Sequence, residues 1–500
     1  MTASITSTSD IVSNDNAGES VAYRRAAIAL VLVGVLYLVL QNVLMSRPLG
    51  LSTDEADYLA KVNPSVPELY WTQVRAWGTP LLAAPVAVFS PSTEAVRLYF
   101  SALSSIAVVA AFWPWRRLLH PAVAPLAALL FATTWFATLF GLLVMPNLYV
   151  GLGAVATTGL FLRAVQTSSR WRTGLAGLAA AFVAVVRPTD SVLLLVPIFA
   201  CALLIPRLRR VDVLAALAIG DLLGWLPWVV EAYQRFGGPL ARLTAGNEGG
   251  LHGGIAFNLV NLLTYPRMLD GSPNYCCYGG PATKAGHLPL LLTVWFVAIP
   301  VLAVFGVVVS RRRGQLPEML LVALPAAMFS IFYILLLEFA NVRFLLPILA
   351  LLSLPVAIGV VFLFKASHAR RVVPGVLVSA AVLGHLALML TTAAHVFPDK
   401  ANQRATSVKQ AALLRPLVPT HPCVVLVPAE PPVLSYYLGC SPGILRPTAQ
   451  PPARVTSALR KGAIVVALTN RPPAPGSYLS AWRRVPLPQL GPKWAAYFAP

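Results

Sequence analysis

The sequence predicts an all-α polytopic membrane protein of about eleven transmembrane helices, followed by a small α/β domain. Hydrophobic residues make up 57% of the 500-residue chain and charged residues only 11%, and the mean hydropathy is +0.72. A soluble protein of this size cannot bury so much apolar surface, and a disordered chain would be far more polar. Apolar stretches of about 17–25 residues, the length that crosses a bilayer, recur along most of the chain.

Residues 1–23 are polar, and we expect them to form a disordered cytoplasmic tail. They lack the basic-then-apolar order of a cleaved signal peptide, so the first span is expected to remain as an anchor. The transmembrane domain is predicted over residues 24–393. Its eleven spans are 24–44, 94–113, 121–142, 146–164, 173–186, 190–205, 211–231, 288–309, 317–338, 343–364 and 372–393, of which the fifth and sixth are short.

Basic residues predict the orientation of the spans. The net charge is +20, and with the amino terminus inside, fourteen Arg and Lys residues fall in the short inner loops and two, Arg187 and Arg343, in the short outer loops. This is the positive-inside pattern of a membrane protein, and it makes the charge an orientation signal toward lipid rather than a nucleic-acid footprint. No outer Asn lies in a glycosylation sequon, which favours a bacterial inner membrane.

Three outer regions are too large to be simple connections: residues 46–93, 232–287 and 394–500. The last is predicted to form an extracytoplasmic α/β domain, because strand-like runs at 423–427 and 463–468 flank a helix that begins near 431. Cys423 and Cys440 would face an oxidising compartment. A disulfide and two free thiols are equally open interpretations, and the adjacent Cys276 and Cys277 would pair with each other only with strain.

An acidic segment, residues 53–58 (TDEADY), directly follows the first span on the outer side. Three carboxylates in four residues at a membrane boundary are costly to desolvate, so one interpretation is that they remain in water. The other is that one of them, Asp54, is a general base near an acceptor hydroxyl, with Glu55 as its support and Asp57 less essential.

This acidic start of a long outer loop resembles the GT-C superfamily of membrane glycosyltransferases, above all the branch of the protein O-mannosyltransferases and the lipid A aminoarabinose transferase. The resemblance covers roughly residues 24–365, and one departure is Met145-Pro146-Asn147, where many members carry a second acidic residue. The segments that follow in the order and sidedness of that branch are 77–81 (WGTPL), 186–189 (VRPT), 226–228 (LPW), 236–239 (FGGP), 286–289 (GHLP) and 342–347 (VRFLLP).

The resemblance implies a polyprenyl-phosphate-linked sugar donor and a cation that binds the carrier phosphate. Arg187 is the candidate that it favours, Arg343 is a second one, and His287 could hold the phosphate or the sugar. A guanidinium is well shaped for phosphate, although an interfacial Arg can also reach lipid headgroups without a further role. Glu338 is expected to orient Arg343 or to pair with it at the surface.

The leading hypothesis is therefore an inverting transfer of a sugar from the carrier to a hydroxyl of a glycan, lipid or protein at the outer side of the membrane. The sequence indicates no cofactor. A divalent metal ion is possible, although the cysteines show no zinc-ligand spacing that would support one. The alternative is a transporter or flippase in which the intramembrane Asp221 couples transport, although Asp221 could also only bond a neighbouring helix. A non-catalytic scaffold of the cell envelope is a third interpretation.

Overall fold

The computed structural model describes residues 8–45, 47–90, 92–248, 257–271, 289–337, 339–370, 373–418, 422–428, 431–446 and 448–500. The chain divides into two compact units. The first unit comprises Met1–Leu44, Ser101–Gly141 and Pro146–Ala394, and the second comprises Met45–Phe100, Leu142–Met145 and His395–Pro500.

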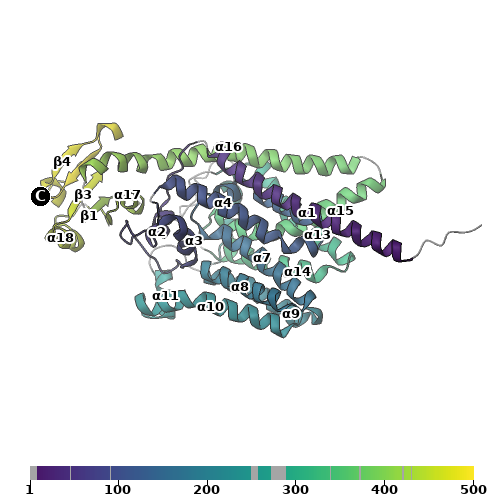
Figure 1. The fold of residues 1–500 in the computed structure, drawn as a ribbon. Helices are drawn as coiled ribbons and strands as arrows, with labels where there is room; N and C mark the ends of the chain where they lie inside the picture. The colour runs from purple at the N-terminus through teal and green to yellow at the C-terminus, as the bar shows by residue number, and fades with distance from the viewer. Residues whose placement is uncertain are drawn as a thin grey trace, which may run out of the picture. The chain divides into compact units, whose positions relative to one another are not determined.

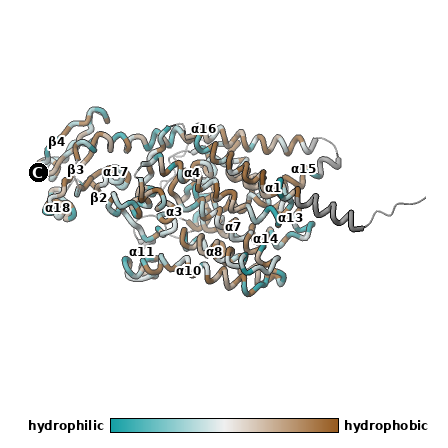
Figure 2. Tube along the Cα trace, in the orientation of Figure 1, coloured by the Kyte–Doolittle hydropathy of each residue, from teal (hydrophilic) through white to brown (hydrophobic). Residues whose placement is uncertain are grey.

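The first unit is built of helices (Figure 1). Its hydrophobic character is evident in Figure 2, where α1 is brown over much of its length. Its elements are α1 (Thr8–Leu44), most of α4 (Thr93–Phe112), α5 (Val123–Ala132), α6 (Trp135–Gly141), α7 (Pro146–Thr167), α8 (Arg170–Val186), α9 (Pro188–Leu204), α10 (Val211–Arg235), α11 (Pro239–Glu248), α12 (Asn261–Met268), α13 (Leu290–Arg312), α14 (Leu316–Ser330), a π-helix η5 (Ile331–Leu336), a 3-10 turn η6 (Val342–Phe344), α15 (Leu345–Arg370) and the first half of α16 (Val373–Leu414).

The polytopic all-α fold class is confirmed, whereas the count of eleven spans is not. Within the described residues, eight helices are long and apolar enough to cross a membrane, or nine if the bent pair α5 and α6 forms one span. The predicted fifth and sixth spans are α8 and α9, and each has 17 residues, the short end of what a bilayer needs. The helix that carries the first span begins at Thr8, inside the segment expected to be a tail, and its apolar part is Val21–Leu44.

The predicted third span is broken rather than straight. Helices α5 and α6 meet at an angle of 79°, and Thr133 and Thr134 lie at the break. The Thr133 hydroxyl donates to the Leu129 carbonyl at 2.7 Å and the Thr134 hydroxyl to the Phe131 carbonyl at 2.8 Å. Threonine hydroxyls that bond the preceding turn weaken and bend a helix, and these two threonines lie where the apolar run divides.

Helices α8 and α10 are packed through glycine. A Cβ atom on Gly220 of α10 would lie 2.0 Å from the Gly177 carbonyl oxygen of α8, so a side chain at this crossing would force the two backbones apart. Small residues allow such close approach between membrane helices. The crossing fixes the position of Asp221, the next residue of α10.

The second unit contains the acidic helix α2 (Thr53–Ala60), α3 (Gly78–Ala87), the end of α16, and a five-stranded sheet with the order β2-β1-β3-β5-β4. Strand β1 is parallel to β2 and β3, and β5 is antiparallel to β3 and β4. The predicted strands and intervening helix are confirmed. The remaining elements are β1 (Cys423–Val427), α17 (Pro431–Leu438), β2 (Ser441–Ile444), α18 (Ala453–Arg460), β3 (Ile464–Thr469), β4 (Arg483–Pro486) and β5 (Ala495–Phe498).

Both faces of this sheet are covered, which explains the continuous apolar run of β1. Val425 and Val466 pack on one face with Leu434 of α17, whereas Val424 and its neighbours pack on the other face with Val455 of α18. A strand buried on two faces reads as uninterrupted hydrophobic sequence.

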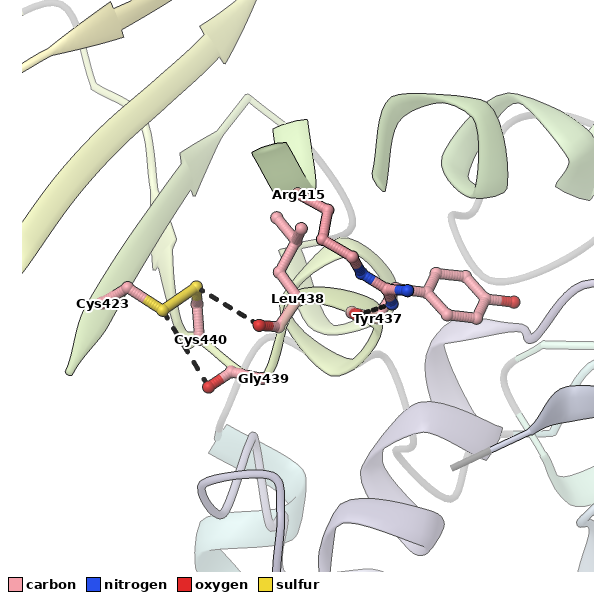
Figure 3. The surroundings of a disulfide bond; sticks show 6 residues. All are labelled: Arg415, Cys423, Tyr437, Leu438, Gly439 and Cys440. Atoms are coloured by element: carbon pink, nitrogen blue, oxygen red, sulfur yellow. Dashed lines mark hydrogen bonds between the residues drawn. A yellow bond between two sulfur atoms is a disulfide. The ribbon is translucent and has the colours of Figure 1, made fainter. Parts of the chain in front are cut away.

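A disulfide joins Cys423, the first residue of β1, to Cys440, just after α17, with 4.9 Å between the Cα atoms (Figure 3). Of the two interpretations of this pair, the structure has the disulfide. Cys201 is a buried free thiol, and Cys276 and Cys277 lie outside the described residues.

Candidate functional site

Helix α2 begins with a capping box. The backbone N–H of Ser52 donates to Glu55 Oε2 at 2.9 Å, and the Ser52 hydroxyl donates to the same oxygen at 3.0 Å. A Ser-x-x-Glu sequence fixes the first turn in this way, and carboxylates in a first turn are stabilised by the helix dipole. The box determines where the helix starts and therefore the directions of Asp54, Glu55 and Asp57.

Glu55 anchors the helix. Its carboxylate is fully buried and pairs with Arg97 of α4 and, at 3.0 Å, with Arg404 of α16. The backbone N–H of Val144 donates to it at 2.9 Å. Burial opposes ionisation of Glu55, but the two guanidinium groups and the hydrogen bonds outweigh it, and its pKa is lowered to about 2. Glu55 is therefore an ionised structural group that ties α2 to the start of α4 and to the second half of α16.

Asp54 and Asp57 share a different arginine. Arg75 Nη2 donates to Asp54 Oδ1 at 3.0 Å and to Asp57 Oδ2 at 2.7 Å, and its Nη1 donates to the Asp54 carbonyl at 3.2 Å. The side chain of Asp54 is 35% exposed, whereas that of Asp57 is 2% exposed. Asp54 is thus the one carboxylate of the helix that is both fixed by a partner and open to an incoming molecule.

The pKa of Asp57 is displaced in the opposite direction from that of Glu55. Burial raises it, Arg75 lowers it, the charge of Asp54 raises it, and the Tyr70 N–H, which donates at 3.1 Å, lowers it; the result is a pKa of about 7. The charge on the pair can therefore change near neutral pH. Because Arg75 is shared, protonation of Asp57 changes how strongly Arg75 holds Asp54.

One aromatic ring contacts this arginine, and two more contact the neighbouring Lys61. The Arg75 guanidinium lies 4.9 Å from the centre of the Tyr58 ring, and Trp71 packs edge-on against Tyr58 at 6.2 Å. Lys61 Nζ lies 4.7 Å from the ring centres of both Trp71 and Trp77. Cation–π contacts of this kind hold buried cations in place, so the rings restrict the movement of the loop that supplies Arg75.

A second cluster, in the first unit, forms around Arg187, which lies between α8 and α9. Its Nε is 3.4 Å from Asp190 Oδ2, and the Tyr333 hydroxyl donates to both carboxylate oxygens of Asp190 at 2.7 and 2.8 Å. The guanidinium carbon lies 5.7 Å from the Tyr333 ring centre and 5.8 Å from that of Phe344. Tyr333 belongs to the π-helix η5, a distortion that is frequent at functional sites.

Arg343 contacts the same phenylalanine. Its guanidinium carbon lies 5.4 Å from the Phe344 ring centre, and its backbone N–H donates to Asn341 Oδ1 at 3.2 Å. The structure therefore brings Arg187 and Arg343 to one ring, and a pair of guanidinium groups so placed has the donors to bind an anion.

The remaining candidates lie apart from these contacts or outside the described residues. Asp221 is half-buried in α10, and its Oδ1 has no hydrogen-bond partner among the described residues. Asn147, in the segment where the sequence departs from the family that it resembles, is fully buried, and neither of its side-chain polar atoms has a partner within the same described part. His287 and Glu338 lie outside the described residues.

The candidates thus form two clusters, each within one unit: Asp54, Glu55 and Asp57 in the second unit, and Arg187 and Arg343 in the first. Among the described residues, no group of three or more His, Cys, Asp or Glu side chains is arranged to hold a metal ion.

Sequence reasoning missed the partners of these residues. Arg75 could have been found as a cation in the same outer loop as Asp54, but Arg97 stands in an apolar span and Arg404 is 349 positions from Glu55, so no local pattern connects them. Asp190 lies only three positions after Arg187, with which the structure pairs it.

The fold that the sequence resemblance predicts is confirmed by its likeness to solved structures. No family model matches the chain, and no curated protein does so.

Among solved structures, ArnT from Cupriavidus metallidurans bound to undecaprenyl phosphate is similar with a TM-score of 0.63 and 13% identity, over 94% of this chain and 97% of that one. The apo form of the same protein is similar with a TM-score of 0.59 and 12% identity, over 94% of this chain and 97% of that one. The oligosaccharyltransferase of Archaeoglobus fulgidus in complex with Zn and sulfate gives 0.55 and 13%, over 88% of this chain and 67% of that one.

Proposed function

We propose that the protein is an inverting glycosyltransferase that moves a sugar from a polyprenyl-phosphate carrier to a hydroxyl acceptor at the outer side of a membrane. The fold is shared with ArnT, a structure of which is bound to undecaprenyl phosphate. The observation that carries the proposal is the Asp54 carboxylate, which is 35% exposed and held at 3.0 Å by Arg75. A fixed, accessible carboxylate is the arrangement that a general base requires.

In the proposed reaction, Asp54 accepts the proton of the acceptor hydroxyl. The acceptor oxygen forms a bond to the anomeric carbon as the bond from that carbon to the carrier phosphate oxygen breaks, and the electron pair leaves with the phosphate. Attack from the side opposite the phosphate inverts the anomeric configuration. Arg75 and Asp57 set the direction and basicity of Asp54, and Glu55 holds the helix through Arg97 and Arg404.

The carrier phosphate is proposed to bind at Arg187, with Arg343 as a second ligand. Asp190 and the rings of Tyr333 and Phe344 hold the Arg187 guanidinium in a defined orientation. A preorganised guanidinium stabilises the charge that develops as the phosphate leaves. His287 remains a predicted ligand of the phosphate or the sugar.

The proposed sidedness places α2 and the residues after His395 outside a bacterial inner membrane. The Cys423–Cys440 disulfide supports this, because disulfides persist in oxidising compartments. Alkaline phosphatase fused after Pro500 should be active. The orientation would be contradicted if this fusion were inactive and if a reporter that fluoresces only in the cytoplasm were fluorescent when fused at the same place.

The direct test uses full-length protein in lipid nanodiscs with a panel of synthetic undecaprenyl-phosphate monosaccharides and membrane extracts as acceptor. We expect labelled sugar to move to an acceptor, and Asp54→Asn to lower the rate by about 10²–10⁴-fold, the usual contribution of a general base. Full activity of Asp54→Asn would remove Asp54 as the base. Transport of a solute without any glycosyl product would favour the transporter alternative.

A further inference from the structure

Helix α17 of the C-terminal sheet binds both ends of the acidic helix α2. The Leu51 N–H, just before the capping box, donates to the Tyr437 hydroxyl at 2.8 Å. Asn63, just after the helix, donates through Nδ2 to the Tyr436 hydroxyl at 3.1 Å, and its own N–H continues the helical pattern by donating to the Leu59 carbonyl at 2.9 Å. Two adjacent tyrosines therefore hold the start and the end of one short helix.

Helix α17 is itself firmly attached to the sheet. Leu434 and Leu438 belong to the core of one sheet face, and the disulfide closes the chain from the start of β1 to Cys440, just after α17. Arg415 Nη2 donates to the Tyr437 carbonyl at 2.9 Å, and the Tyr437 ring points away from the disulfide (Figure 3). The two hydroxyls are thus presented from a rigid base.

A helix as short as α2, with 8 residues, is not stable by itself, so its position depends on its tertiary contacts. Glu55 fixes one side of the first turn, but that contact alone does not fix the rotation of the helix about its anchor. Arg75 and the Tyr70 N–H hold the opposite side through the aspartates, and the tyrosine hydroxyls add a constraint at each end of the helix. A displacement of about 1 Å at a reacting group can cost roughly 10²-fold in rate.

We propose that Tyr436 and Tyr437 are positioning residues that set the placement of α2 and thereby of the Asp54 carboxylate. This assigns the C-terminal domain a part in building the reaction site, in addition to any part in acceptor binding, and it rests on the proposed function. Loss of the Tyr437 hydroxyl leaves the Leu51 N–H without its acceptor, whereas the ring and its packing are kept in phenylalanine.

The test compares Tyr437→Phe, Tyr436→Phe and the double variant in full-length protein, with Tyr478→Phe as the matched control. Tyr478 lies in the same domain but packs on the opposite face of the sheet from α17. Hydrogen exchange of the amides of residues 51–63 requires no substrate, and kcat and KM are measured with the undecaprenyl-phosphate monosaccharide that the wild type uses.

We expect the double variant to exchange residues 51–63 about tenfold faster, because both hydrogen bonds to α2 are lost, and to lower kcat about tenfold at unchanged KM for the donor. The control should match the wild type in both measurements. Unchanged exchange and kcat in the double variant would overturn the proposal, as would an equal loss in the control. If exchange rises but the wild type transfers no sugar, the proposed function fails, and the tyrosines are contacts without a positioning role.

Discussion

The two sides of helix α2 carry carboxylates in opposite electrostatic surroundings. Glu55 meets two guanidinium groups, those of Arg97 and Arg404, whereas Asp54 and Asp57 meet the same one, that of Arg75. The positive surplus lowers the pKa of Glu55 to about 2. Burial and the neighbouring carboxylate raise the pKa of Asp57 to about 7.

Within four residues of sequence, Glu55 thus anchors the helix, whereas Asp54 and Asp57 are suited to proton transfer. A carboxylate that stays ionised at every physiological pH is suited to hold structure, since it has no proton to exchange. A pair of carboxylates that competes for one arginine is suited to accept a proton, because its charge is incompletely compensated. The comparison predicts that substitutions on the two sides will affect different properties of the protein.

The largest effect is expected at Glu55. Glu55→Gln leaves the guanidinium groups of Arg97 and Arg404 buried beside a neutral side chain, and breaking a buried ion pair from one side costs about 3–5 kcal/mol. The melting temperature in detergent, followed by tryptophan fluorescence, should decrease clearly, and activity should fall in proportion to the folded fraction.

Asp212→Asn is the control, because Asp212 is 53% exposed and its partner Arg210 is 31% exposed. An exposed pair contributes little to stability, so the melting temperature should barely change. Wild-type stability in Glu55→Gln together with a lost reaction would reverse the roles assigned to the two sides of α2.

The Arg187 cluster differs from the Arg75 cluster, because Arg187 is held by one carboxylate, that of Asp190, and by two aromatic rings. Arg187→Gln should weaken binding of undecaprenyl phosphate by about 10–100-fold, because a charged hydrogen bond contributes about 1.5–3 kcal/mol. Binding is measured by native mass spectrometry on full-length protein. Arg207→Gln, at a side chain that is 50% exposed and paired with Glu318, should bind like the wild type, and equal affinity in both variants would remove Arg187 as the phosphate ligand.

Hydropathy and charge were sufficient to predict the fold class. Two apolar runs in the terminal domain predicted the strands β1 (Cys423–Val427) and β3 (Ile464–Thr469). The bend between α5 and α6 was not predictable from hydropathy, because the residues on both sides of it form one continuous apolar stretch. The disulfide could not be decided from spacing either, since it depends on how α17 brings Cys440 back to β1.

For the candidate site, the acidic segment could be found in the sequence, but the different partners and roles of its three carboxylates could not. Glu55 was expected to support Asp54, yet its contacts lead to Arg97 and Arg404, whereas Asp57, expected to matter less, shares Arg75 with Asp54. These partners lie up to 349 positions away in the chain, and a sequence of this kind carries no local signal for pairings at such separations.

The smallest predicted effect concerns pH. When Asp57 is protonated, the charge of Arg75 acts on Asp54 alone and makes Asp54 a weaker base. When Asp57 ionises, its added negative charge makes Asp54 a stronger base. The raised pKa of about 7 therefore predicts a rate that rises with pH through neutrality. The change should be about tenfold, the effect of one pKa unit.

The most direct measurement of this division is the pH–rate profile of wild type and Asp57→Asn with the same undecaprenyl-phosphate monosaccharide. We expect the rate of the wild type to rise with pH near pH 7. Asp57→Asn should stay at the lower rate at every pH, because its residue 57 is always neutral. Superimposable profiles would contradict the claim that two aspartates sharing Arg75 form the proton-accepting side of the helix.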